Sequence, residues 1–239
     1  MIGSRSPSRP YRRRWFYELR VAVDRDVPVL VVLSWATWTA VLAWRERNGP
    51  LTAPFVLGGM ELVLPLLGAA ITATVTGRDW EEGTIPWRLS LPGGATRLLL
   101  VRTITAGVVW LVAVGAWAAT AAATWHPAHP AAVAPAGIRW QASDVLVLLV
   151  PPALWLAALS LAGTLLGRAS LWGIVAASAF WLADLASSGT LVDPLGVLYL
   201  RAGPLALDYA ANRRWLVGGA VAVAVLTSLG FRREERWLR

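Results

Sequence analysis

The sequence lacks cysteine and lysine altogether, and it has only two histidines among its 239 residues. Without cysteine there are no disulfides, no thiolate metal sites and no cysteine nucleophiles. Without lysine there is no Walker A loop, because that loop needs the lysine to reach the β- and γ-phosphates of ATP. A Gly-rich phosphate loop is also missing, so any ATP hydrolysis by this route must come from another polypeptide.

Charged residues are scarce as well. They make up 15% of the chain, against about 25% in a soluble domain, while 56% of the residues are hydrophobic and the mean hydropathy is +0.55. Such a chain is suited to a bilayer, where only helices or closed barrels satisfy the backbone. We predict an all-α polytopic membrane protein. No soluble stretch is long enough to form a basic nucleic-acid-binding face.

Long apolar stretches define the predicted spans. A helix needs about 20 mostly apolar residues to cross the hydrocarbon layer. Six stretches meet this requirement, and the fifth is the shortest: Val27–Trp44, Pro54–Thr76, Leu98–Trp125, Asp144–Leu166, Leu171–Ala186 and Trp215–Phe231.

The distribution of arginine predicts the orientation. With the N-terminus in the cytoplasm, sixteen of the 22 basic residues lie inside and six outside, as the positive-inside rule requires. Both termini and the loop 77–97 are then cytoplasmic. Residues 1–26 form a tail with an amphipathic interfacial helix, residues 27–231 the six-helix membrane domain, and residues 232–239 a basic tail.

Two acids fall within or near membrane depth, namely Glu61 in the second span and Asp184 near the outer end of the fifth. Intramembrane carboxylates usually face a bundle interior or a wet cavity. The sequence leaves two interpretations open: a role in a substrate path or between subunits, and a hydrogen-bonded structural acid.

Two further features of the sequence predict local backbone geometry. Gly163 and Gly167 permit close helix approach. The stretch Ser187–Arg214 has apolar pieces too short to cross the membrane, and it predicts short helices or a re-entrant hairpin interrupted at Pro194, Gly203 and Pro204.

The loop between the second and third spans carries the densest acidic cluster. Asp79 and Glu82 have a spacing like that of a capping box, and Thr84 can cap a short helix that has Pro86 in its first turn. We expect this amphipathic helix to cover Ile85–Leu91. A partner protein or the membrane surface should then cover its apolar side chains, Ile85, Trp87, Leu89 and Leu91.

The stretch "WEEGTIPWRLSLPGGATR" resembles an element of the integral membrane subunits of type-2 ABC exporters. In that family an acidic "E-x-x-x-G-T" element leads to a short helix that ends in "L-P" and a basic residue. The family also has six helices with both ends inside, an amphipathic helix before the first span and a broken segment between spans five and six. Pro86-Trp87 departs from the family, whose members often have an acidic residue after Gly-Thr.

The resemblance implies a permease subunit that exports a hydrophobic or amphipathic substrate across the bacterial cytoplasmic membrane. It would not be an enzyme itself. Two copies of a cytoplasmic ABC ATPase would bind ATP and Mg²⁺, and a second permease, identical or a sister chain, would complete the pathway. The implied ATPase-coupling residues are Glu81, Glu82, Gly83, Thr84, Ile85, Trp87, Arg88 and Leu91.

Two other functions are alternatives. An ion- or proton-coupled carrier could use Glu61 and Asp184. An intramembrane protease could use paired glutamates followed by arginine, but the histidines that it also needs, His126 and His129, would lie on the opposite membrane face from Glu81 and Glu82. Prolines flank both histidines, and we predict no metal site.

Overall fold

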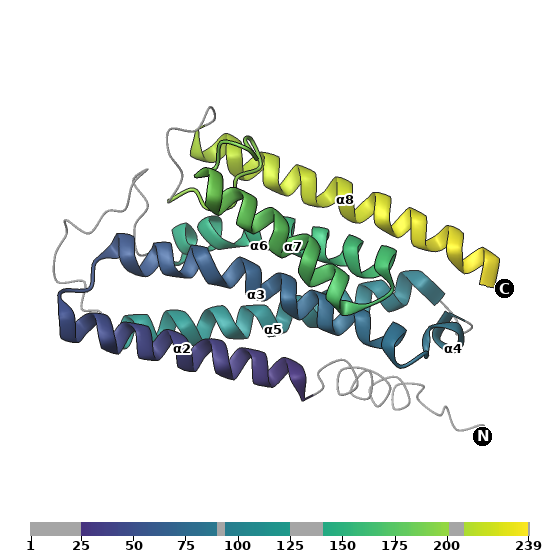
Figure 1. Cartoon of the computed structure of the whole chain (residues 1–239), viewed down its shortest axis with the longest axis horizontal. Helices are drawn as coiled ribbons and strands as arrows, with labels where there is room; N and C mark the ends of the chain where they lie inside the picture. Colours follow the sequence, from purple (N-terminus) through teal and green to yellow (C-terminus); the bar gives the residue numbers. More distant parts are fainter. Residues whose placement is uncertain (1–24, 90–93, 125–140, 201–207, 239) are drawn as a thin grey trace, which may run out of the picture.

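The computed structural model describes residues 25–89, 94–124, 141–200 and 208–238, and Figure 1 shows their arrangement. Within these ranges the chain forms helices and turns without any strand, which confirms the all-α fold. The helices are α2 (Asp26–Asn48), α3 (Ala53–Glu81), α4 (Ile85–Leu89), α5 (Gly94–Thr124), α6 (Ala142–Gly167), α7 (Ser170–Ser187) and α8 (Tyr209–Leu238).

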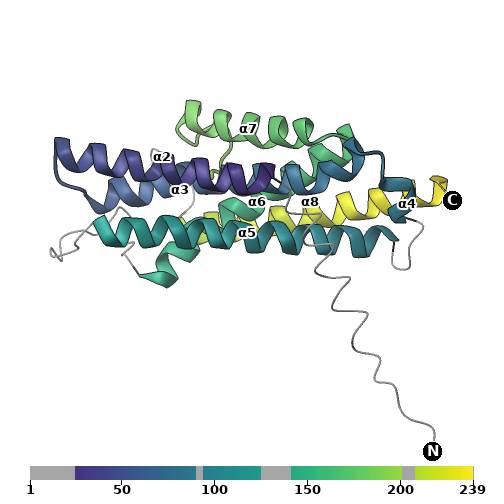
Figure 2. The same cartoon turned by 90° about the horizontal axis from the view of Figure 1, so that it is seen from below.

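Six of these helices, all except the short α4, are long and apolar enough to cross a membrane. They coincide with the six predicted spans, which indicates a multi-pass membrane protein. Consecutive spans run antiparallel, so α3, α6 and α8 share one direction, and α4 and the end of α8 lie at the same end of the bundle (Figures 1 and 2). This end is called the α4 end below, and the opposite end is called the far end.

Several boundaries differ from the sequence predictions. Helix α3 continues through Glu81, so the first residues of the predicted loop 77–97 are helical. Helix α8 continues to Leu238, so the predicted basic tail is helical over 232–238. The short helix predicted over Ile85–Leu91 is present over Ile85–Leu89, and its last two residues lie outside the described ones. The amphipathic helix predicted before the first span lies almost wholly outside the described residues, as does Leu91.

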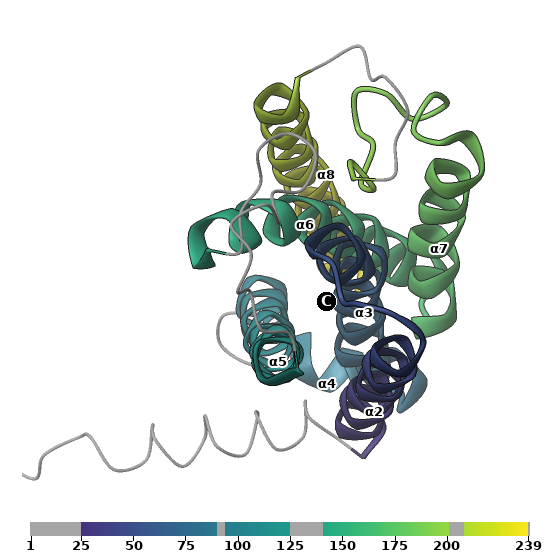
Figure 3. The same cartoon turned by 90° about the vertical axis from the view of Figure 1, so that its left-hand side faces the viewer.

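Helix α3 lies at the centre of the bundle. The end-on view in Figure 3 shows α2, α5, α6 and α7 around it, with α8 packed against α6. Tryptophans from two neighbouring helices donate their indole N–H to carbonyls of α3: Trp110 of α5 to Leu64 at 2.8 Å and Trp181 of α7 to Leu62 at 3.0 Å. Because α3 is buried on several sides, polar side chains at either end of this helix can bond to more than one neighbouring element.

The contact between α6 and α7 depends on glycine. A Cβ atom on Gly163 would lie 2.6 Å from the carbonyl oxygen of Trp172, and one on Gly173 would lie 2.5 Å from that of Ser160. The close approach predicted from Gly163 is therefore present. It brings the start of α7 next to the end of α3, where the first candidate site lies.

Candidate functional site

The first site is built around α4, a single helical turn between α3 and α5. Thr84 precedes it, and the backbone N–H of Arg88 donates to the Thr84 carbonyl at 3.0 Å. Ile85 and Leu89 are only 3% and 2% exposed because they pack into a cluster with Leu98, Leu99, Leu161, Leu165 and Phe231. The expectation that a partner protein or the membrane surface covers Ile85 and Leu89 is therefore wrong, since α5, α6 and α8 cover them within the chain.

Asp79, in the last turn of α3, holds α4 in place from the inside. It is 1% exposed and accepts two hydrogen bonds from Arg102 of α5, at 2.8 and 3.0 Å. Arg88 of α4 forms an ion pair with the same carboxylate at 2.7 Å. Asp79 therefore connects α3, α4 and α5. It does not cap a following helix with Glu82, as the spacing predicted, because Asp79 lies in the last turn of α3 and Glu82 is the C-cap residue of that helix.

Glu81 points to the other side of α3 and receives the start of α7. Its carboxylate accepts the backbone N–H of Ser170 at 2.9 Å and also the Ser170 hydroxyl. The two elements lie very close, since a Cβ on Gly77 would be 2.5 Å from the Ser170 nitrogen. Glu81 thus satisfies an orphan N–H at the first turn of α7, and it fixes the α6–α7 connection to α3.

The remaining predicted coupling residues lie at the surface of this end. Glu82 forms an exposed i,i+4 pair with Arg78. Gly83 occupies the left-handed region at φ 66°, which suits glycine at the end of α3. Trp87 is 62% exposed on α4. The structure thus separates the described part of the predicted set into an inner group, Thr84, Ile85 and Arg88, and an outer group, Glu81, Glu82, Gly83 and Trp87.

The second site lies at the far end and contains Glu61. This carboxylate is 1% exposed and accepts the consecutive backbone N–H groups of Tyr199 and Leu200, at 2.9 and 2.8 Å. Arg213 of α8 donates to it at 2.7 Å. The same guanidinium lies 4.9 Å from the ring centroid of Tyr209, a cation–π contact.

Asp184 binds the backbone of the two residues that precede Tyr199, in the same way that Glu61 binds Tyr199 and Leu200. One of its oxygens accepts the N–H groups of Val197 and Leu198, both at 2.8 Å. Asn212 of α8 donates to the carbonyls of Pro194 and Gly196, at 2.9 and 3.0 Å. Four consecutive amides, from 197 to 200, are therefore divided between two buried acids. We call this arrangement the far-end clamp: Glu61, Asp184, Asn212 and Arg213 holding residues 194–200.

The clamp explains how a broken segment can lie beside apolar helices. Residues 188–200 form turns with no helix, and an unsatisfied backbone group is costly in an apolar environment. The clamp supplies acceptors for these amides. Glu61 lies eight residues from the start of α3, which is about 12 Å along the helix at 1.5 Å per residue. Because Tyr199 and Leu200 bond to Glu61, the broken segment folds back alongside the bundle to this depth. This placement favours the hydrogen-bonded interpretation of both acids, and a substrate-path role stays a prediction.

The larger cavity described lies between α2 and α3, near the far end. It has a volume of about 510 Å³, and its walls include Trp38, Phe55, Trp117 and Leu200. This volume falls within the range of about 300–1,000 Å³ that is typical of small-molecule sites. Neither Glu61 nor Asp184 is among its described lining residues, whereas Leu200 connects the cavity directly to the clamp.

Sequence reasoning missed the partners of the acids. The positive-inside rule uses Arg102 and Arg213 only as orientation charges, yet they are 2% and 4% exposed and form ion pairs with Asp79 and Glu61. The sequence does contain a signal for Arg213. This arginine adjoins Asn212 at the start of a span, and a buried acid in another span needs a positively charged partner. Ser170 was also missed, since nothing local distinguishes it.

Among the described residues, no group of three or more histidine, aspartate and glutamate side chains could hold a metal ion. His126 and His129 lie outside those residues. Comparisons of the chain with protein-family models, with curated proteins and with solved structures give no match.

Proposed function

We propose that this chain is the membrane-spanning permease subunit of a type-2 ABC exporter in the bacterial cytoplasmic membrane. One observation carries the proposal: α4 is held rigidly from within by Asp79, Ile85 and Leu89, and yet it presents a large aromatic side chain, Trp87, outward. A free loop needs no such support, whereas a helix that transmits movement from an ATPase does.

The proposed assembly has two permease chains and two ATPase subunits, which bind ATP and Mg²⁺. Interface energy usually concentrates in a few aromatic or arginine anchors. In our proposal Trp87 is the anchor, and Arg88 acts through Asp79 to hold the helix that carries it. The cavity between α2 and α3 favours a hydrophobic or amphipathic substrate, because tryptophan and phenylalanine line it.

Site-specific photocrosslinking tests the proposal, and the chain offers a matched control. Trp87 is 62% exposed at the α4 end, and Trp44 is 63% exposed near the far end. A photoreactive residue is placed at one position or the other, and the chain is co-expressed with candidate ABC ATPase subunits. We expect position 87 to capture an ATPase subunit and position 44 to capture none.

A binding measurement supports the crosslinking. Trp87→Ala should weaken ATPase association by about 2 kcal/mol, as truncation of a hot spot does, which corresponds to roughly 30-fold in Kd. Trp44→Ala should leave it unchanged. Capture of lipid alone at position 87, together with unchanged binding of Trp87→Ala, would refute the proposal and make Trp87 an anchor in the headgroup layer.

A further inference from the structure

A second cavity lies halfway along the bundle, away from both candidate sites. Its volume is about 230 Å³, and four helices line it: α3, α5, α6 and α8. The lining positions fall near the middle of each helix, for example Gly68 in α3, Gly107 in α5, Ala157 in α6 and Ala220 in α8. In a bundle that crosses a membrane, this depth is that of the hydrocarbon core.

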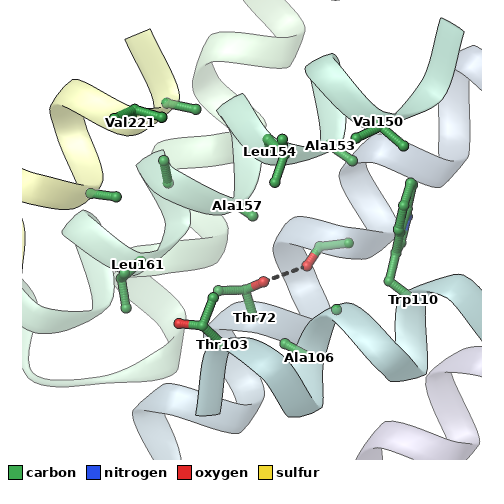
Figure 4. A pocket seen from close by; sticks show the side chains of 15 residues that line it. Thr72, Thr103, Ala106, Trp110, Val150, Ala153, Leu154, Ala157, Leu161 and Val221 are labelled. Atoms are coloured by element: carbon green, nitrogen blue, oxygen red, sulfur yellow. Dashed lines mark hydrogen bonds between the residues drawn. The ribbon is translucent and has the colours of Figure 1, made fainter. Parts of the chain in front are cut away.

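The cavity is open towards the outside of the bundle. Gly107, Leu154 and Val221 lie at its rim and are exposed, and α5 and α8 contact each other only sparsely. Ala157 and Leu161 line the wall that α6 contributes (Figure 4). Small side chains on facing helices thus leave a gap that opens sideways, where the neighbours of a spanning helix are lipid chains.

The walls suit an uncharged, apolar occupant. The described lining residues carry no charge. The Thr72 hydroxyl donates to the Gly68 carbonyl at 2.8 Å, and the Trp110 indole N–H donates to the Leu64 carbonyl, so these two donors are already used, and Thr103 is the third polar residue of the lining. An apolar cavity of about 150 Å³ stays dry and takes up apolar molecules, and this cavity is larger than that.

Size distinguishes between possible occupants. A drug-sized ligand needs about 300 Å³ or more, so the mid-depth cavity is too small for a bulky cargo but admits a slim chain. We propose that this cavity binds the acyl chain of a bilayer lipid, which enters between α5 and α8 and packs against α6. The proposal does not depend on an ATPase partner, so it can fail or hold independently of the proposed function.

Two glycines of α5 provide the test. A Cβ on Gly107 or on Gly115 meets no atom within 4 Å, and only Gly107 lines the cavity. Gly107→Phe should therefore fill the mouth without disturbing the fold, and Gly115→Phe is the matched control. The full-length protein is reconstituted in nanodiscs with phosphatidylcholine that carries a diazirine midway along one acyl chain. After irradiation, labelled peptides are mapped by mass spectrometry.

We expect the label to concentrate on the α5, α6 and α8 peptides that line the cavity. Gly107→Phe should abolish this enrichment, whereas Gly115→Phe should retain it. In lipid-free detergent, added phosphatidylcholine should raise the unfolding temperature of the wild type and of Gly115→Phe but not that of Gly107→Phe. Uniform labelling around the bundle, labelling unchanged in Gly107→Phe, or a non-lipid molecule that co-purifies in the cavity would each overturn the proposal.

Discussion

Replacing Asp79 by asparagine tests the idea that α4 is held from within. The substitution preserves the size of the side chain and one carbonyl acceptor, but it removes the negative charge. Arg88 and Arg102 would then face each other beside a neutral amide, with Arg102 only 2% exposed. The helix with the fewest other attachments is α4, which has a single turn. We therefore expect α4 to detach first, while the six long helices stay assembled.

The magnitude follows from the burial of the pair. Removing one partner of a buried ion pair costs about 3–5 kcal/mol. Because asparagine still accepts one hydrogen bond and Arg88 is partly exposed, we expect the lower end, about 3 kcal/mol. Since each 1.4 kcal/mol is a factor of ten, the population with α4 detached should rise by roughly 100-fold.

Hydrogen exchange in nanodiscs measures this population directly. The amide of Arg88, bonded to the Thr84 carbonyl, should exchange about 100-fold faster in Asp79→Asn. Glu82→Gln is the control because it removes an exposed i,i+4 pair, worth about 0.3–0.5 kcal/mol. Asp79→Asn combined with Arg102→Gln should recover part of the protection, because one of the opposed charges is gone. If Asp79→Asn accelerated exchange no more than Glu82→Gln, the buried network would not hold α4.

Two further predictions concern stability, measured by thermal unfolding of the protein in nanodiscs. Glu61→Gln leaves Arg213 buried opposite a neutral amide and should cost about 3–5 kcal/mol, whereas the exposed Glu46→Gln should change stability by less than about 0.5 kcal/mol. A Glu61→Gln protein with wild-type stability and impaired transport would instead favour the substrate path. Gly77→Ala puts a Cβ 2.5 Å from the Ser170 nitrogen and should destabilise the protein by about 1–3 kcal/mol. Gly115→Ala, in open space, should not destabilise it, and equal effects of the two would contradict the close approach of α3 to α7.

The spans could be predicted from the sequence because the signal is a property of each segment alone. Twenty apolar residues identify a membrane helix whatever surrounds it, and the described helices agree. The ends of the helices were harder to predict from the sequence. Nothing in the charged stretch around Asp79 shows that α3 continues through Glu81, since its charges find partners on α4, α5 and α7 rather than in water.

The candidate sites were predictable only in part, and for a related reason. The sequence identified Glu61, Asp184 and the α4 segment as unusual, because charged residues are rare in this chain. It could not identify their partners. Arg102 lies 23 residues from Asp79 and Arg213 lies 152 residues from Glu61, and helical periodicity does not predict contacts over such separations. Without those partners, a buried acid and a pathway acid have the same sequence signature.

The separation of Glu61 from Arg213 also has a consequence for biosynthesis. At about 5–20 residues per second, the ribosome needs roughly 8 to 30 s to make the 152 residues between them. Throughout that interval Glu61 exists without its arginine partner, and the amides of residues 199 and 200 are made only near its end. A nascent chain that stops before α8 therefore lacks the arginine partner of the acid in its second span. Synthesis of the start of the last helix is thus also the step that completes the polar contacts of the second span.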